Sequence, residues 1–373
     1  GRRGRRALVA MGTVVVTHAL GSYPVRVESG ALALLGEVVE NRLAGRRVAA
    51  IADAAVLALY REGRLGPVTW EGEALDFPPG ERSKTRDTWA RLTDGLLERG
   101  FGRDSGLIAL GGGVAGDLAG FVAATYLRGV PYVQVPTTLL AMLDASVGGK
   151  TGVDTSHGKN LIGAFHPPVA VISDPRVLAT LPEREYRAGM AEAVKHGLIA
   201  DREYFRWIER ETAALLRRDP EVLEHLVRRS VEIKAEVVSG DEREQGRRAI
   251  LNAGHTVAHA LERATGYALT HGEAVGLGLV AECELAGRLG LAAPALRERV
   301  EKLLAALGLP TRLPAPLAGR TLLEAMAADK KNREARVRFA LPEALGEMPR
   351  GGEWTLPAPE ADVLAAVEVI QPA

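Results

Sequence analysis

Short apolar runs alternate with amphipathic stretches in the first half of the chain. Runs rich in β-branched residues predict strands at Val14–Thr17, Val25–Glu28, Val48–Ala52, Val68–Trp70, Leu107–Leu110 and Tyr132–Val135. Apolar residues at helical spacing predict helices over 31–44, over 84–99, and from the glycines at 111–113 to Leu127. Such alternation predicts a mostly parallel sheet with helices on both faces.

The pattern changes beyond about Pro175, where stretches rich in Leu, Ala, Glu and Arg dominate. Helical spacing predicts helices over 183–199, 204–216, 220–238, 252–264 and 272–289. Strand signals almost disappear. We therefore predict an α/β domain over residues 1–174 and an all-helical domain over residues 175–373.

Composition narrows the classes of function. Lys plus Arg and Asp plus Glu number 47 each, so bulk charge gives no attraction to nucleic acid or to an anionic membrane. We find no apolar run that predicts a membrane span or a targeting peptide. The single cysteine, Cys283, excludes an intrachain disulfide and favours a reducing cytoplasm.

Histidines and a glutamate in the helical half predict metal chemistry. His255 and His259 stand one helical turn apart, with His271 shortly after and Glu192 upstream. Two imidazoles and a carboxylate, with a fourth position open, form the ligand set of a catalytic zinc site. For the helical pair alone, hydrogen-bonded core histidines are the simpler interpretation; the other motifs of the chain favour the metal.

A glycine run between a predicted strand and a predicted helix covers Gly111–Asp117. Glycines let the backbone approach a pyrophosphate, and the start of a helix offers free N–H groups. The spacing departs from the usual dinucleotide fingerprint, and a plain tight turn is the alternative. Asp53 ends an earlier strand, where it would accept hydrogen bonds from a ribose or cap a helix. Glu81 and Lys84 follow a Pro-Pro-Gly turn, where they would bind the same cofactor or cap the following helix.

Lysines and an asparagine stand among glycines in the segments 144–154 and 158–165. The run Gly148–Thr151 resembles a P-loop, but the first glycine of that motif is absent, so we reject nucleoside-triphosphate binding. Lysine and amide groups suit a small anionic substrate, and a solvated loop is the alternative. In the helical half, Lys195, Lys234, Arg248 and Asn252 suggest a substrate with two acidic groups; each is otherwise an ordinary surface residue.

Together these motifs resemble the 3-dehydroquinate synthase family of the sugar-phosphate cyclase superfamily. The resemblance runs from about Val48 to Pro342. It is carried by 111–117, Pro136–Leu140, 144–150, Gly158–Asn160, Glu192 with Lys195, Leu251–Thr256 and Asp329–Lys331. It implies a Rossmann-like NAD-binding α/β domain, an all-α metal- and substrate-binding domain, an active site between them, and a homodimer.

The resemblance also implies roles for single residues. Zinc, or cobalt in its place, would be held by Glu192, His255 and His271, which makes His259 a substrate-side residue. NAD would be held by Asp53, Glu81, Lys84, Gly112, Gly113, Val114, Asp117, Thr137, Thr138, Asp144, Lys150 and Lys159. Substrate would be bound by Arg128 of the neighbouring subunit and by Lys150, Lys159, Asn160, Lys195, Lys234, Arg248, Asn252, His259 and one of Lys330 or Lys331. The chemistry would involve Asp144, Lys150, Glu192, Lys195 and His259.

The implied reaction converts 3-deoxy-D-arabino-heptulosonate 7-phosphate to 3-dehydroquinate and phosphate. NAD would oxidise a ring hydroxyl polarised by zinc, phosphate would leave, hydride would return, and ring opening and an aldol step would close the carbocycle. The chain departs from the family at Ala253, commonly Phe, and at Asp154, commonly Asn. The alternatives are a cyclase of the 2-deoxy-scyllo-inosose or valiolone type, a metal-dependent alcohol dehydrogenase that releases NADH, and a non-catalytic NAD sensor.

Overall fold

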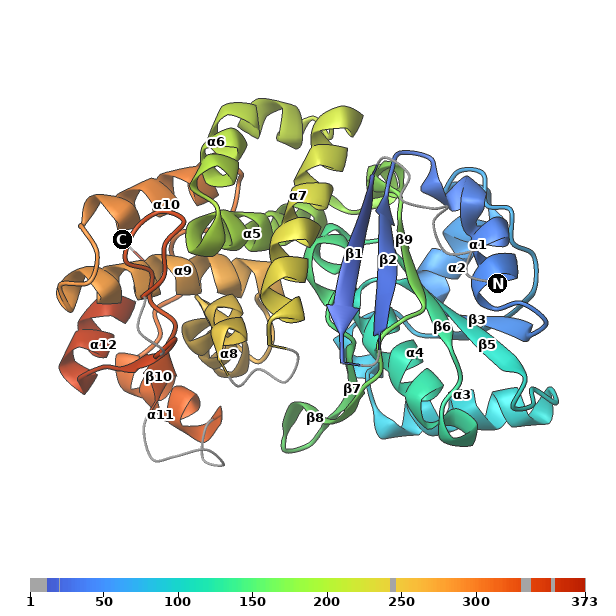
Figure 1. Cartoon of the computed structure of the whole chain (residues 1–373). Coiled ribbons are helices and arrows are strands. Elements are labelled where there is room, and N and C mark those ends of the chain that lie inside the picture. The colour runs from blue at the N-terminus through green and yellow to red at the C-terminus, as the bar shows by residue number, and fades with distance from the viewer. Residues whose placement is uncertain (1–11, 20, 242–245, 330–336, 350–352, 373) are drawn as a thin grey trace. The chain divides into compact units, whose positions relative to one another are not determined.

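A computed structural model describes residues 12–19, 21–241, 246–329, 337–349 and 353–372 (Figure 1). Contacts divide the chain into two compact units, 1–181 with 223–235, and 182–222 with 236–373. The boundary between residues 174 and 175 that the sequence predicted remains a prediction. Among the described residues, no helix is long and apolar enough to cross a membrane.

The first unit is built on a seven-stranded sheet. Its strand order is β1-β2-β9-β6-β5-β3-β4, parallel except for the β1–β2 pair. The strands are β1 (Thr13–His18), β2 (Gly21–Val27), β3 (Arg47–Asp53), β4 (Glu73–Phe77), β5 (Ser105–Gly111), β6 (Tyr132–Pro136) and β9 (Ala170–Ser173). An antiparallel hairpin of β7 (Lys150–Thr155) and β8 (Gly158–Phe165) stands apart from the sheet. The predicted parallel α/β architecture is confirmed.

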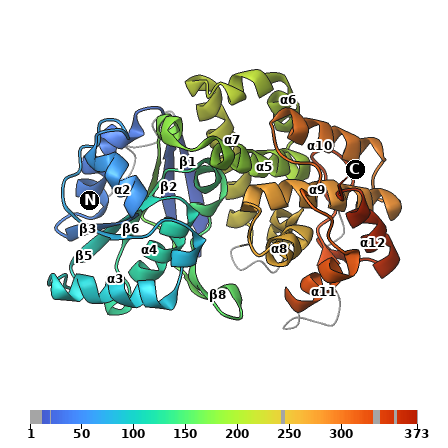
Figure 2. The same ribbon diagram turned by 180° about the vertical axis from the view of Figure 1, so that it is seen from behind.

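Helices cover both faces of that sheet. They are α1 (Leu35–Arg42), α2 (Ala54–Arg61), α3 (Arg86–Glu98) and α4 (Gly113–Thr125), with short 3-10 turns η1 (Ala31–Leu34), η2 (Glu81–Ser83), η3 (Tyr126–Arg128) and η5 (Pro175–Thr180) and the π-turn η4 (Ala141–Ala145). In both views α3 and α4 lie on the opposite side of β3, β5 and β6 from α1 and α2 (Figures 1 and 2). The core between the sheet and α4 includes Ile51, Leu107, Leu118 and Val122, all fully buried.

The prediction of a strand at Val68–Trp70 is wrong. The strand of this region is β4, which the prediction missed. Thr69 instead bonds to the helical segment beside it, because its hydroxyl donates to Ala33 O (2.9 Å) and accepts from Gly36 N (3.0 Å). Thr69 is therefore bonded to a helical segment, and residues 68–70 do not form a strand.

Among the described residues of the second unit, the strands are the two-residue β10 (Arg338–Phe339) and β11 (Leu356–Pro357), and the other regular elements are helical. Its helices are α5 (Glu183–Ala200), α6 (Arg202–Leu216), α8 (His255–Ala264), α9 (His271–Arg288), α10 (Ala295–Ala306), α11 (Gly319–Asp329) and α12 (Glu360–Glu368), with the 3-10 turn η6 (Arg247–Asn252). Helix α7 (Pro220–Ser239) contributes its middle to the first unit.

Helix α9 is the centre of the second unit. It packs against α5, α8, α10 and α12, and both views show it between α5 and α8 (Figures 1 and 2). Its inner face is almost entirely buried and includes the single thiol, Cys283, which is 2% exposed. The helix predicted over 252–264 begins only at His255, because Gly254 takes a left-handed conformation (φ +79°).

Candidate active site

Three helices of the second unit bring Glu192, His255 and His271 together. Nε2 of His255 lies 3.6 Å from Glu192 Oε1, and Nε2 of His271 lies 3.7 Å from the same oxygen. One ligand atom from each residue lies within 4.8 Å of the others. Ligand atoms around a tetrahedral zinc ion with bonds of about 2.1 Å are about 3.4 Å apart. The donor set and its spacing therefore fit a divalent ion of this kind.

Each histidine is the first residue of its helix. The N-cap Thr270 and Glu273 form a capping box at the start of α9, and Arg184 holds Glu273 through both carboxylate oxygens (2.8 and 2.6 Å). The start of α8 has no side-chain cap of its own. Its backbone N–H groups at Gly254 and Val257 instead donate to buried Glu282 of α9. Because helix starts leave N–H groups without helical partners, these acceptors fix where both histidines stand.

Glycines allow the three helices to approach closely. A Cβ at Gly272 would lie 1.8 Å from Ala188 O on α5, and a Cβ at Gly278 would lie 2.0 Å from Gly254 O beside α8. Both contacts are with backbone atoms, which cannot rotate away. The positions of the ligand-bearing helices therefore depend on glycine at two points of α9.

The pKa values of His255 and His271 are shifted in opposite directions by their surroundings. Burial lowers the pKa of His255 to about 3, and the neighbouring Lys195 adds to that effect. Burial also opposes protonation of His271, but the neighbouring carboxylates of Glu192 and Glu262 outweigh burial and raise its pKa to about 9. Lys195 forms an ion pair with Glu192 one turn away, and both side chains are almost completely buried. The cluster thus holds a lysine ammonium directly beside the proposed ligand carboxylate.

His259 lies at the margin of the cluster. Its ring is 5.6 Å from that of His255 and 6.4 Å from that of His271, and the residue is exposed. The residue whose ligand atom lies within 4.8 Å of those of Glu192 and His255 is His271, not His259. Arg248 is 3% exposed in η6, where its backbone N–H donates to Asp241 Oδ2 (3.0 Å), and Asn252 ends the same turn half-buried.

In the first unit, the glycine run stands between a strand and a helix as predicted. Strand β5 ends at Gly111 (φ +151°), and α4 begins at Gly113. A Cβ at Gly112 would lie 2.9 Å from the Thr138 side chain, and Thr137 N–H donates to Gly111 O (2.9 Å). Asp53 caps α2 by accepting from Val56 N (2.8 Å), so the capping interpretation holds whether or not it also binds a ribose.

Several other proposed cofactor residues form ion pairs in the first unit. Lys84, 4% exposed, lies 2.5 Å from Asp117 of α4. Lys159 of β8 lies 3.6 Å from Glu81. The fold thereby joins the Pro-Pro-Gly turn both to the glycine run and to the hairpin.

The hairpin and its surroundings carry the remaining basic residues. Asn160 has a left-handed backbone (φ +54°), and its N–H donates to Asp154 (2.9 Å). Lys150 is exposed at the start of β7, and Lys234 of α7 lies 2.7 Å from Asp144. Arg128 is exposed after α4, where Leu127 and Arg128 both have positive φ, an uncommon conformation that often marks a functional position.

Two buried glutamates near the cluster were not among the predicted site residues. Glu262 and Glu282 are 3% and 1% exposed. Glu262 could have been found, because it stands seven residues after His255 on the same helix face. Glu282 gave no such signal, since its partners are backbone groups of another helix. Lys330 and Lys331 lie outside the described residues.

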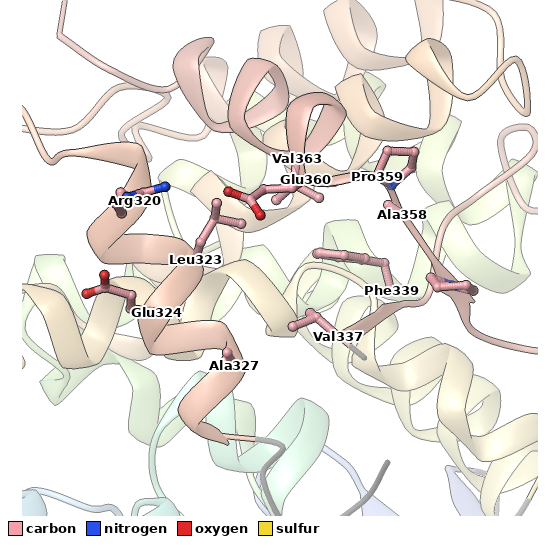
Figure 3. A pocket seen from close by; sticks show the side chains of 11 residues that line it. Arg320, Leu323, Glu324, Ala327, Val337, Phe339, Ala358, Pro359, Glu360 and Val363 are labelled. Carbon is pink, nitrogen blue, oxygen red and sulfur yellow. The ribbon is translucent and has the colours of Figure 1, made fainter. Parts of the chain in front are cut away.

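A separate pocket of about 740 Å³ lies elsewhere in the second unit (Figure 3). Side chains of α11, α12 and the β10–β11 region line it, including Leu323, Phe339 and Val363, with Arg320, Glu324 and Glu360 also contributing (Figure 3). It shares no lining residue with the Glu192–His255–His271 cluster.

Solved structures define the class of this fold and site. The chain superimposes on 2-deoxy-scyllo-inosose synthase complexed with carbaglucose-6-phosphate, NAD+ and Co2+ (TM-score 0.85, 26% identity, 95% of this chain and 99% of the other). It is also similar to a 2-epi-5-epi-valiolone synthase from Streptomyces hygroscopicus subsp. jinggangensis 5008 with NAD+ and Zn2+ bound (TM-score 0.83, 30% identity, coverage 96% and 99%). The fold is that of the sugar-phosphate cyclases.

Sequence comparison identifies the family within that class. Models described as 3-dehydroquinate synthase N-terminal and C-terminal match residues 74–188 and 189–332. A 3-dehydroquinate synthase of Halorhodospira halophila (strain DSM 244 / SL1) is 49% identical over 94% of this chain and 97% of its own. One of Desulforamulus reducens (strain ATCC BAA-1160 / DSM 100696 / MI-1) is 43% identical, with coverage of 96% and 99%. The chain belongs to the 3-dehydroquinate synthase family, and the resemblance inferred from its motifs is confirmed.

Proposed function

We propose that this enzyme converts 3-deoxy-D-arabino-heptulosonate 7-phosphate to 3-dehydroquinate and phosphate, with NAD and a divalent metal ion. The observation that carries the proposal is the Glu192–His255–His271 cluster in a chain up to 49% identical to 3-dehydroquinate synthases. The cyclase structures that hold NAD+ with Co2+ or Zn2+ support both cofactors.

When bound, NAD would accept and return a hydride, and the metal would polarise the reacting hydroxyl as a Lewis acid. Glu192, His255 and His271 are the residues that would hold the metal. The groups proposed for NAD are Asp53, Glu81, Lys84, Gly112, Gly113, Val114, Asp117, Thr137, Thr138, Asp144, Lys150 and Lys159. The ion pairs of Lys84 with Asp117 and of Lys159 with Glu81 would keep part of this set in place.

The basic residues would bind the two acidic groups of the substrate. A guanidinium binds a carboxylate through two parallel hydrogen bonds, which suits buried Arg248, with Asn252 beside it in the same turn. Lys150, Lys159 and Asn160 of the hairpin, with Lys195, Lys234 and His259, would complete the polar set, and Asp144 would orient Lys234. The departing phosphate would itself take the proton, so no dedicated protein base is needed.

We also propose a homodimer in the cytoplasm, with Arg128 reaching the substrate phosphate of the partner subunit. The left-handed backbone at Leu127 and Arg128 supports a specialised role there. Leu161 and Phe165 of β8 are 59% and 54% exposed, which suits a surface covered by a second copy. A single buried cysteine is compatible with a reducing compartment.

The primary test follows phosphate release from the heptulosonate phosphate, with and without a chelator, while NADH absorbance is monitored. Release that requires both metal and NAD, without net NADH, is the expected result. No release despite bound NAD and metal would overturn the proposal. Net NADH would indicate an ordinary dehydrogenase.

A cyclase acting on a substrate without a carboxylate is the second candidate, favoured by the TM-score of 0.85 with 2-deoxy-scyllo-inosose synthase. Arg248→Ala and Arg248→Lys separate the two. For a carboxylate substrate, both variants should lower kcat/KM by at least about 10-fold, because a charged hydrogen bond contributes about 1.5–3 kcal/mol. Metal content should not change. Unaltered kcat/KM, or turnover of a hexose 6-phosphate instead, would favour the second candidate.

A further inference from the structure

The two histidines of the cluster point the same ring nitrogen inward. Each presents Nε2 to Glu192 Oε1, at 3.6 Å for His255 and 3.7 Å for His271. Their outer nitrogens have different neighbours. Nδ1 of His255 lies 3.1 Å from Ala253 O, whereas Nδ1 of His271 lies 3.5 Å from Glu262 Oε1. An imidazole that binds a metal through one nitrogen donates a hydrogen from the other, so each outer neighbour is an acceptor in the right place.

Glu262 occupies a position that its own helix does not favour. It stands in the last turn of α8, which ends at Ala264, where the helix dipole disfavours a negative charge. It is also 3% exposed, and burial of a carboxylate is costly unless a donor or a cation lies beside it. The ring N–H of His271 provides such a donor.

One face of α8 therefore serves both histidines. His255 and Glu262 are seven residues apart, which places them on the same side of the helix. His255 contributes a ligand from the first position of α8. Glu262 lies beside the ring of His271, which begins α9. A single helix thus supplies one ligand and the acceptor for the other ligand.

We propose that Glu262 is a positioning residue that accepts a hydrogen bond from Nδ1–H of His271 and thereby directs Nε2 to the divalent ion. The inference rests on the metal site of the proposed function. It assigns to Glu262 a role exerted through His271 and not by direct binding of metal or substrate.

The test uses the full chain, stripped of metal and loaded with Co2+. Affinity is measured by competition with a chelator, and site geometry by the visible absorption of Co2+. Glu262→Ala should weaken Co2+ binding by about 10- to 100-fold. Glu262→Gln retains an oxygen acceptor without the charge, so its affinity should fall between that of the alanine variant and that of the native chain.

A second readout follows the imidazole N–H protons directly. In the Co2+-loaded native chain, proton NMR should show two shifted, exchangeable signals, one from each ligand histidine. In Glu262→Ala one signal should exchange faster with water, while the other stays as in the native chain. A purely structural loss would not select one signal.

Asp174→Asn is the matched control for loss of a buried carboxylate. Asp174 is 1% exposed and lies in the first unit. Its carboxylate accepts hydrogen bonds from the Arg176 guanidinium and from the backbone N–H of Leu32. This variant should lose stability and keep native Co2+ affinity. Native affinity with both N–H signals unchanged in Glu262→Ala would overturn the inference, and so would an equal loss in Asp174→Asn. Native affinity in His271→Ala would overturn the metal site itself.

Discussion

The two units hold their polar groups by different means. In the second unit, His255 and His271 are the first residues of helices that touch one another through backbone atoms at glycines. In the first unit, Lys84, Asp117, Glu81 and Lys159 are fixed mainly by ion pairs between side chains, some of them exposed. The difference teaches that the metal cluster depends on helix packing, whereas these four proposed cofactor residues depend on individual charges. Single substitutions should therefore have different effects in the two units.

The largest effect is expected for Gly272→Ala. The added methyl would lie 1.8 Å from Ala188 O, so α5 and α9 would have to separate next to His271. We expect a loss of about 3 kcal/mol in the free energy of unfolding, measured in urea, together with weaker metal binding.

Gly276→Ala is its control on the same helix. The nearest atoms to its Cβ are 3.7 Å away, in the Leu304 side chain. Alanine should stabilise α9 there by up to about 1 kcal/mol and leave metal binding unchanged. Equal behaviour of the two variants would contradict the role of close helix packing.

The next effect is expected for Asp117→Asn in the first unit. It leaves the ammonium of Lys84, 4% exposed, without its carboxylate. Because Asp117 is itself 21% exposed, we expect a loss of about 2 kcal/mol, less than for a fully buried pair. Thermal unfolding measures it. Lys159→Met, which removes the more exposed pair with Glu81, should change stability by less than about 0.5 kcal/mol.

Asp53 allows the capping role to be separated from the proposed binding role. Asp53→Ala removes the N-cap of α2 and should cost about 1 kcal/mol, whereas Asp53→Asn keeps a capping oxygen. If the carboxylate also accepts from the cofactor ribose, both variants should bind NAD about 10-fold more weakly. Calorimetric titration with NAD measures this. Native NAD affinity in Asp53→Asn would restrict Asp53 to capping.

The smallest effect concerns an exposed ion pair on the helix that carries Glu192. Hydrogen bonds from Arg187 and then Arg218 lower the pKa of Glu183. A lowered pKa adds stability above the unfolded value, and this stability is lost as pH falls through the folded value. Glu183→Gln should therefore cost about 0.3–0.5 kcal/mol at pH 7, and the difference should begin to shrink as pH falls below about 4.3, the ordinary pKa of a glutamate. Urea unfolding of both chains from pH 7 downward measures this difference. A difference that does not change with pH would contradict the role of the charge.

Periodicity predicted most of the fold, and its failures have physical causes. The long helices of the second unit and strands β1, β3, β5 and β6 were predicted because their apolar spacing is regular. The β7–β8 hairpin was missed, because glycines and lysines interrupt its alternation and four consecutive residues of β8 are exposed. The break at Gly254 was missed because apolar spacing continues through it.

The candidate site was predictable where its residues are close in sequence or match a family motif. The pairing of Lys84 with Asp117 joins residues 33 positions apart, which no local pattern reveals. The choice between His259 and His271 as the second imidazole also needed information beyond spacing. The helical pair is the nearer in sequence, but the start of another helix places His271 beside Glu192.

The buried thiol of Cys283 can serve as a chemical probe of how often α9 opens. Burial, reinforced by Glu282, raises the pKa of the Cys283 thiol, so the reactive thiolate is scarce while the helix is packed. Since the chain has one cysteine, each molecule can gain only one label, and mass spectrometry counts labelled molecules without ambiguity. The labelling rate would report how often α9 opens in the native population, and a bound ion that joins the starts of α8 and α9 should slow it.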